Sequence, residues 1–267
     1  MILSPLERAL SRVPDVPGRV DVRGMLLSGK AGVRTAAGAD PAHDGFIVLL
    51  PARSLASVIG RPPCTAIAAA IGEVSGDVNV LCEVENSGAV EACLRGWTRQ
   101  TALIHTWSGA IDWDPGAETG TTIFSEADAP DLSHVPDHLR TELTEALSGR
   151  PRVRFVAGEL PPRGNLSLVT GLEMCAAWQD GLPVAFCYPV VQTETLWDVS
   201  IDTLEGYRHR GLGTRAARRM IRRLLEFGKW PVWGALESNQ ASRALAARLG
   251  FIEADRLTVF SLPGVRS

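Results

Sequence analysis

The sequence of 267 residues predicts an α/β (α+β) fold, and three observations in its C-terminal part predict that class. Strand signals follow one another at 172–179, 184–191 and 196–202, and the short turn DGLP at 180–183 makes a hairpin of the first two. A long amphipathic helix comes next, with apolar residues at 3.6-residue spacing. A strand at 231–237, a helix at 239–250 and a strand at 257–262 complete the order.

The N-terminal part carries helix and strand signals of its own. We expect helices at 4–12, 64–71 and 87–96, strands at 46–50, 77–84 and 101–107, and a loop at 28–45. Proline, glycine and acidic residues interrupt this pattern at 112–120, and a helix follows at 135–147. The interruption predicts two domains, residues 1–115 and residues 120–267.

The composition is that of a protein with a sizeable core and no strong overall charge. Hydrophobic residues make up 45% of the chain and its net charge is −3, so no global positive field attracts nucleic acid. The N-terminal residues lack a signal-peptide core, and no apolar run approaches membrane-spanning length. We therefore expect a cytoplasmic protein that binds neither nucleic acid nor a membrane.

The five cysteines are predicted to be buried free thiols in a reducing compartment. Their number is odd and no two of them lie close together in the sequence. They are Cys64, Cys82, Cys93, Cys175 and Cys187. No cluster of histidine, cysteine and aspartate has metal-ligand spacing, so we expect no metal.

A glycine-rich turn between the strand at 196–202 and the amphipathic helix is the first candidate site. Arg208, Gly211 and Gly213 form the pattern R-x-x-G-x-G. Glycines there allow a tight turn whose N–H groups, with the helix N-terminus, can hold an anion such as a pyrophosphate. The helix then carries arginines that we interpret as a solvated face, contact with a ligand phosphate or nucleic acid being the alternative; they are Arg215, Arg218, Arg219, Arg222 and Arg223.

These segments together resemble a known family. The run YRHRGLGTRAARRMI after LWDVSIDT, followed by PVWGALESNQASRALAARLGF, resembles the acyl-CoA-binding core of the GNAT N-acetyltransferase superfamily from about residue 120 to 262. Within it, WDVSIDTLEGYRHRGLG is most similar to the bacterial zwittermicin-resistance-type branch. The resemblance implies a mixed, mostly antiparallel sheet flanked by helices.

The resemblance also implies that the protein binds acetyl-CoA. The pyrophosphate would lie on backbone amides of the turn, and the pantetheine arm between the strands at 196–202 and 231–237. The implied binding residues are Ile201, Thr203, Arg208, His209, Arg210, Gly211, Leu212, Gly213, Thr214, Asn239 and Ser242. For Asn239, a plain helix cap is the alternative interpretation.

Acetyl transfer to an amine requires a base, because an ammonium group has no lone pair. Asp198 lies close to where some family members carry a strand carboxylate, and Glu194 and Glu173 are the next candidates. The alternative is that Asp198 is a structural hydrogen-bond acceptor. Many members carry a tyrosine that protonates the leaving thiolate, and this chain has Ala246 there.

The segment 80–97 is similar in pattern to 232–251, since both run from a strand through Glu and Asn to an apolar helix. We interpret the N-terminal lobe as a degenerate GNAT-like repeat that lost phosphate binding, with an unrelated α/β lobe as the alternative.

The leading hypothesis is an acetyl-CoA-dependent N-acetyltransferase that acts on a primary amine of a small molecule by direct attack in a ternary complex. A non-catalytic acyl-CoA-binding or interaction module is the alternative, and nucleic-acid binding through the arginines is a third. The acceptor, the group that protonates the thiolate and the oligomeric state are left open.

Overall fold

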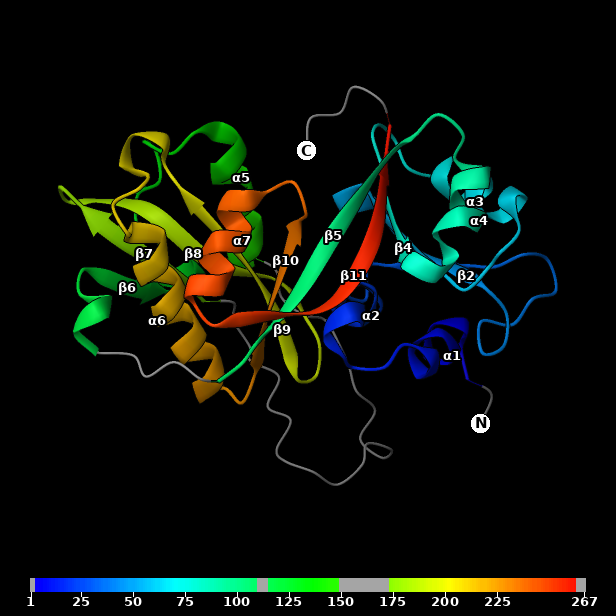
Figure 1. Ribbon diagram of the computed structural model, residues 1–267, viewed down its shortest axis with the longest axis horizontal. Coiled ribbons are helices and arrows are strands. Elements are labelled where there is room, and N and C mark those ends of the chain that lie inside the picture. The colour runs from blue at the N-terminus through cyan, green and yellow to red at the C-terminus, as the bar shows by residue number, and fades with distance from the viewer. Residues whose placement is uncertain (1–2, 110–114, 149–172, 263–267) are drawn as a thin grey trace. The chain divides into compact units, whose positions relative to one another are not determined.

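The structure is a computed structural model that describes residues 3–109, 115–148 and 173–262 (Figure 1). The chain divides into two compact units. Unit 1 consists of Met1–Ile104, Gly234–Gln240 and Glu253–Ser267, and unit 2 of His105–Trp233 and Ala241–Ile252. Unit 1 is therefore completed by segments from the end of the chain, whereas the sequence suggested two consecutive domains. Residues 112–114 of the expected boundary segment lie outside the described residues.

Unit 1 is built on a sheet in the order β1-β2-β3-β4-β11. Its elements are α1 (Pro5–Arg12), α2 (Val20–Leu27), β1 (Gly32–Arg34), β2 (Phe46–Leu50), β3 (Leu55–Ile59), α3 (Cys64–Ile71), β4 (Asn79–Glu83) and α4 (Ser87–Cys93). Three further strands have residues in both units: β5 (Thr98–Trp107), β10 (Trp230–Leu236) and β11 (Phe251–Ser261). The pairs β1–β2, β2–β3 and β4–β11 are antiparallel, and β3–β4 is parallel.

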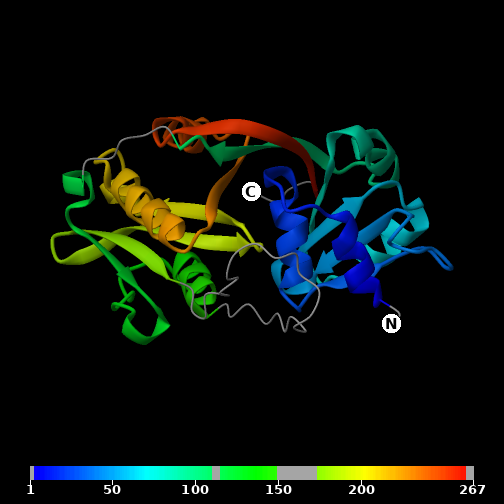
Figure 2. The ribbon, with the colours of Figure 1, turned by 90° about the horizontal axis from the view of Figure 1, so that it is seen from below.

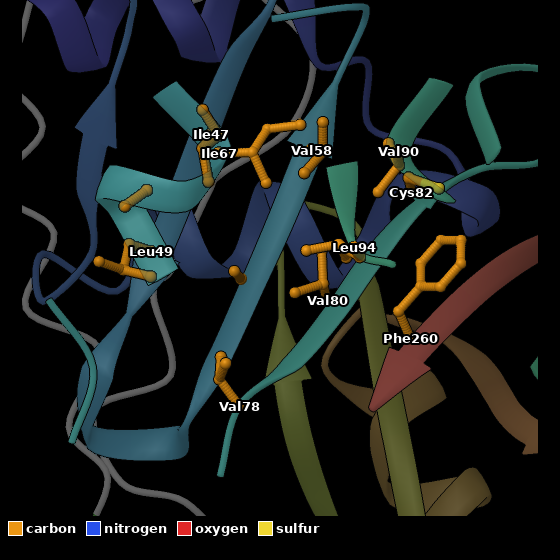
Figure 3. Close-up of a cluster of buried hydrophobic side chains, with 12 residues drawn as sticks. Ile47, Leu49, Val58, Ile67, Val78, Val80, Cys82, Val90, Leu94 and Phe260 are labelled. Carbon is orange, nitrogen blue, oxygen red and sulfur yellow. The ribbon is translucent and has the colours of Figure 1, made fainter. Parts of the chain in front are cut away.

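Helices cover both faces of the unit 1 sheet, which explains the unbroken apolar run of β2. Alternate residues of a strand point to opposite faces. Helices α1 and α2 lie against one face and α3 and α4 against the other (Figure 2). Phe46 and Val48 pack with residues of α1 and α2. Ile47 and Leu49 pack with residues of α3 and α4 (Figure 3). Phe260 of β11 is fully buried in the same core as Ile47.

Unit 2 has the same kind of sheet, in the order β10-β9-β8-β7-β6. Its elements are β6 (Thr121–Phe124), α5 (Asp137–Ser148), β7 (Met174–Gln179), β8 (Leu182–Gln192), β9 (Leu196–Thr203), α6 (Leu212–Glu226) and most of α7 (Gln240–Arg248). The pairs β6–β7, β7–β8 and β8–β9 are antiparallel, and β9–β10 is parallel. Helix α5 covers one face and α6 the other (Figure 2). The predicted mixed, mostly antiparallel sheet flanked by helices is confirmed.

The two units share one order of elements. In unit 1 the antiparallel pair β2–β3 is followed by α3 and by β4, which runs parallel to β3. In unit 2 the antiparallel pair β8–β9 is followed by α6 and by β10, which runs parallel to β9. This agreement favours the interpretation of the N-terminal lobe as a repeat.

Cysteines 64 and 93 correct one prediction, because they form a disulfide and are not free thiols. They are separated by 29 residues, and the packing of α3 beside α4 brings their Cα atoms to 5.0 Å. Sequence spacing could not show this, since it depends on tertiary packing. Cys82, Cys175 and Cys187 are free and buried, as predicted.

Four elements were not predicted. Helix α2 is buried nearly all round, so it lacks the polar face that identifies a helix in a sequence. Strand β1 has only three residues and lies inside the segment 28–45, which was expected to be a loop. Strand β6 has only four residues. Strand β3 lies in a segment bounded by glycine and two prolines. In the described part of the chain, no helix has the length and apolar character that crossing a membrane requires.

Candidate active site

The turn that joins β9 to α6 has a backbone that only a few residue types adopt. A short 3-10 turn, Glu205–Tyr207, leads to Arg208, and His209 and Gly211 then have left-handed φ angles of 62° and 76°. Gly211 is the N-cap of α6. Glycine adopts this conformation without a steric penalty, so the predicted glycine at 211 has a backbone reason.

Backbone N–H groups converge at the start of α6. The first helical hydrogen bond of this turn runs from Arg215 N to Gly211 O, at 3.1 Å. The amides of Leu212, Gly213 and Thr214 therefore have no acceptor within the helix, and Gly211 has no side chain that could cap them. Together with the positive end of the helix dipole, these groups form an anion-binding site.

Gly213 is required by close packing of α6 on β9. A Cβ atom at this position would lie 2.9 Å from Thr203 Oγ1 and 3.4 Å from Ile201 Cγ2. Its absence lets the first turn of α6 rest on β9. Three of the predicted cofactor-binding residues, Gly213, Thr203 and Ile201, thus meet at one point.

Two arginines of the turn are oriented by backbone carbonyl groups. Arg208 Nε donates to Thr203 O at 3.3 Å, and an Arg210 guanidinium nitrogen donates to Gly206 O at 3.0 Å. The Arg210 guanidinium also lies 5.3 Å from the centre of the Tyr207 ring. Arg208, His209 and Arg210 are exposed, so the turn adds positive charge to the amides at the start of α6.

The arginines farther along α6 correct the expectation of a solvated face. Arg219 and Arg222 form ion pairs with Glu118, whose side chain is only 7% exposed. Arg223 forms a double hydrogen bond with Glu173, at 2.5 and 2.8 Å, and Arg215 donates to Thr119 O at 3.0 Å. These four side chains are bound within unit 2, and they hold η4 (Pro115–Glu118) and the start of β7 against α6.

Strands β9 and β10 pair over only part of their length. Their register joins Leu196–Asp198 to Trp230–Val232, whereas β9 pairs with β8 as far as Thr203. In the described register, the later residues of β9 therefore have a strand partner on one side. Such a position can accept hydrogen bonds from an extended ligand.

The three predicted base candidates have different surroundings. Asp198 is half-buried on β9, opposite Val191 and Val232. Glu194 lies in the turn before β9, where Lys229 Nζ donates to its backbone carbonyl at 2.6 Å. The two hydrogen bonds that Arg223 donates to the Glu173 carboxylate raise the pKa of Arg223 above its ordinary value, so this carboxylate is occupied by the ion pair.

A polar group that the sequence analysis missed lies farther along β9. The Tyr188 hydroxyl of β8 donates to Asp202 Oδ2 at 2.8 Å and lies 3.3 Å from Glu142 Oε2 of α5. Burial, and then the charge of Asp202, raise the pKa of Tyr188 above its ordinary value. The alternation that places Asp198 and Asp202 on one face of β9 was a usable signal.

The remaining predicted residues are placed as follows. Ser242 Oγ accepts a hydrogen bond from Trp233 Nε1 at 2.9 Å, and Asn239 directly precedes α7. Ala246, the residue that replaces the family's tyrosine, is fully buried. Among the described residues, no three histidine, cysteine or acidic side chains come together as a metal site.

Two buried thiols lie on neighbouring strands, since Cys175 of β7 faces Cys187 of β8. Burial raises the pKa of Cys175 to about 12 and that of Cys187 well above its ordinary value. A thiol nucleophile needs a lowered pKa. Neither cysteine therefore has the surroundings of a nucleophile.

Comparisons with known proteins identify this architecture. Residues 171–260 match the family model of the GNAT acetyltransferases. A GCN5-related N-acetyltransferase-like protein from Streptococcus suis has a similar structure, with TM-score 0.64, 16% identity, and 96% of this chain and 98% of that chain covered. A GNAT-family acetyltransferase from Colwellia psychrerythraea gives 0.57 at 14% identity, with 98% of each chain covered.

A tandem GNAT protein from the clavulanic acid biosynthesis pathway gives a TM-score of 0.54 at 14% identity, with 98% of this chain and 94% of that chain covered. The comparison with curated proteins returned no match. At these identities the structural likeness establishes the fold, and the family model adds a sequence match in the C-terminal region. The chain thus has the GNAT fold, and its residues 171–260 match the family model of the GNAT acetyltransferases.

Proposed function

We propose that the protein transfers the acetyl group of acetyl-CoA to a primary amine of a small molecule, by direct attack in a ternary complex. The observation that carries the proposal is the start of α6. There the left-handed His209 and Gly211 and the amides of Leu212–Thr214 form a site for a pyrophosphate.

Residues of the turn and of β9 fit a bound acyl-CoA. Arg208, His209 and Arg210 would surround its phosphates, and the backbone of Ile201 and Thr203 would pair with its extended arm. Asn239 and Ser242 remain predicted contacts. The thioester supplies an activated acetyl group, and the protein's task is to orient it and to keep the amine neutral.

Asp198 is the favoured base. It is half-buried on β9 at the last residue pair that joins β9 to β10. An amine that approaches β9 there could pass its proton to this carboxylate, directly or through a water. Glu194 is the next candidate, and Glu173 is disfavoured because Arg223 occupies both of its carboxylate oxygens.

The raised pKa values of the buried thiols support direct transfer. A ping-pong route would need an acylated side chain, and a buried thiol whose pKa is near 12 forms little thiolate at neutral pH. The proposed order is therefore binding of both substrates before any bond is made.

A non-catalytic acyl-CoA-binding module is the second candidate. Ala246 favours it, because this fully buried residue has no group that could protonate a leaving thiolate. For partners and location, we expect a small-molecule amine, no nucleic acid and no membrane, and a cytoplasmic protein.

Release of free thiol from acetyl-CoA over a panel of primary amines tests the proposal, with CoA binding measured by calorimetry. We expect binding together with amine-dependent thiol release. Binding without release on any amine would favour the module. A folded Gly211→Val protein that still binds CoA and still releases thiol as the wild type does would contradict the phosphate site.

A further inference from the structure

The disulfide of unit 1 links the start of one short helix to the end of another. Cys64 is the first residue of α3 and Cys93 is the last residue of α4. Helix α3 has eight residues, of which Ile67 and Ala70 are buried. A helix of this length is unstable alone and depends on its attachments. The disulfide is therefore a main attachment of α3.

The corresponding helix of unit 2 is attached differently. Helix α6 has 15 residues and buries six of them, Leu212, Ala216, Ala217, Met220, Ile221 and Leu224. Where α6 begins after a glycine, α3 begins after Pro62 and Pro63, which have no N–H groups to offer an anion. Unit 1 thus has Cys64 at the first position of the helix that corresponds to α6.

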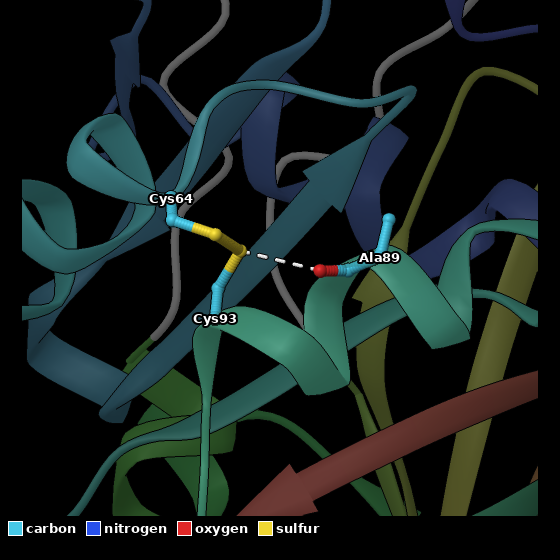
Figure 4. The surroundings of a disulfide bond; sticks show 3 residues. All are labelled: Cys64, Ala89 and Cys93. Carbon is cyan, nitrogen blue, oxygen red and sulfur yellow. Dashed lines mark hydrogen bonds between the residues drawn. A yellow bond between two sulfur atoms is a disulfide. The ribbon is translucent and has the colours of Figure 1, made fainter.

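The two sulfur atoms have different surroundings (Figure 4). Cys64 is exposed and Cys93 is half-buried. Cys93 Sγ lies 3.2 Å from the carbonyl oxygen of Ala89, one turn earlier in α4. A reduced Cys93 could donate its S–H to this oxygen. The structure therefore already contains the acceptor for one of the two thiols that opening of the bond would produce.

We propose that the Cys64–Cys93 disulfide exchanges with a low-molecular-weight thiol, and that Cys64 is the sulfur that becomes modified. Exposed disulfides are the ones that exchange readily. The small thiolate attacks Cys64 Sγ, the bond to Cys93 breaks, and its electron pair goes to Cys93 Sγ. Cys93 takes up the proton that the small thiol lost, and its S–H then donates to Ala89 O. A second small thiol can free Cys64 and leave as the small-molecule disulfide.

Exchange has a conformational consequence. With the cross-link open, α3 is held by Ile67 and Ala70, while the ladder of β2, β3 and β4 stays intact. Residues 64–71 should therefore loosen without unfolding of unit 1. Cys82 should not react, since burial and the charge of Glu83 raise its pKa to about 12.

Peptide mapping by mass spectrometry tests the proposal on the full chain purified without reductant. The protein is incubated with reduced glutathione, quenched with acid and alkylated with N-ethylmaleimide. We expect glutathione on Cys64, maleimide on Cys93 and faster amide hydrogen exchange at 64–71. Glutathione on Cys93, or a disulfide that survives until denaturant is added, would overturn the proposal.

Single variants give a second test that does not depend on the intact bond. Cys93→Ser leaves Cys64 free and Cys64→Ser leaves Cys93 free. Because thiol reactivity follows exposure, an aromatic disulfide reagent should react about tenfold faster with the first variant. Equal rates, or the reverse order, would refute the assignment of Cys64.

The double variant Cys64→Ser/Cys93→Ser is the matched control for the conformational part. Its residues 64–71 should exchange fast with or without glutathione. Protection equal to that of the oxidised wild type would show that the disulfide does not hold α3.

Discussion

Thr203 of β9 packs directly against Gly213 of α6: a Cβ atom added to Gly213 would lie only 2.9 Å from Thr203 Oγ1. The first turn of α6 therefore rests on β9 without an intervening side chain. This contact places the amides of α6 next to the residues of β9 that the family resemblance assigns to the cofactor. The anion site and the strand are therefore built as one piece, and a change at Gly213 should affect both.

Gly213→Ala should weaken CoA binding and lower the free energy of unfolding by about 1–3 kcal/mol, the usual cost of overpacking. The added Cβ would force α6 away from Thr203. Calorimetry with CoA and denaturant unfolding measure the two effects. Gly206→Ala is the matched control, because a Cβ at Gly206 meets no atom within 4 Å. Equal behaviour of the two variants would contradict the packing argument.

Asp198→Asn should lower the turnover of the wild-type reaction by about 10²–10⁴-fold with nearly unchanged CoA affinity, since its proposed role is proton transfer. Steady-state thiol release at several pH values measures this. A variant that matches the wild type between about pH 6 and pH 9 would move the role of base to Glu194.

Glu173→Gln separates a structural carboxylate from a catalytic one. It removes the ion pair with Arg223 and should lower the free energy of unfolding by about 1–2 kcal/mol, with turnover close to that of the wild type. Thermal unfolding and thiol release are measured on the same preparation. Strong loss of turnover in a protein of unchanged stability would restore Glu173 as a base.

Asp21→Asn should change the pH dependence of stability. Asp21 lines a cavity of about 10 Å³ with Ser57 and Glu83, and burial raises its pKa from 3.8 to about 6. The folded protein thus binds a proton more tightly than the unfolded chain does, so stability falls as the pH rises from about 4 to 6 and is then level.

Above pH 6, the buried Asp21 should lower the free energy of unfolding by up to about 3 kcal/mol, at 1.36 kcal/mol per pKa unit. Asp21→Asn should therefore stabilise the protein at pH 8 and have little effect at pH 4, as measured by denaturant unfolding. Asp77→Asn, at an exposed residue, is the control. A gain that is the same at both pH values would contradict the assignment.

Lys229→Met should lower the free energy of unfolding by about 2 kcal/mol, because buried carbonyl groups lose a charged donor. The buried ammonium donates to Thr193 O at 3.3 Å and to Glu194 O at 2.6 Å, in the turn that leads into β9. Lys30→Met, at the other lysine of the chain, is exposed and should change stability by less than about 0.5 kcal/mol. Denaturant unfolding compares the two.

Local signals predicted most of the long elements. The apolar run of β2, the hairpin between β7 and β8 and the amphipathic period of α6 each reflect the burial that the structure shows. Helix α2 could not be found in this way, because it is buried nearly all round and its apolar residues do not follow a helical period. Elements on both sides of α2 bury it, so the spacing of its apolar residues does not mark it as a helix.

In the candidate site, too, the sequence predicted the residues that have a local signal and missed the contacts between residues far apart in the chain. Gly211 follows from the left-handed backbone of the turn, and Gly213 from the close packing of α6 on β9; both belong to a glycine pattern that is visible in the sequence. The partners of Glu173 and of the Tyr188 hydroxyl come from residues 50 and 14 positions away, so no local pattern contains them. The Cys64–Cys93 bond was missed for the same reason.

The last strand also sets the order in which the protein can form during synthesis. Leu257–Phe260 of β11 pair with β4, and Phe260 enters the core beside Val80 and Cys82. Unit 1 therefore has an open sheet edge and an exposed core until the ribosome has released these residues. Most of unit 2 is the continuous segment His105–Trp233, which emerges earlier. Domains usually complete their folding from the N-terminus onward, whereas here the N-terminal unit is completed after most of unit 2 has emerged.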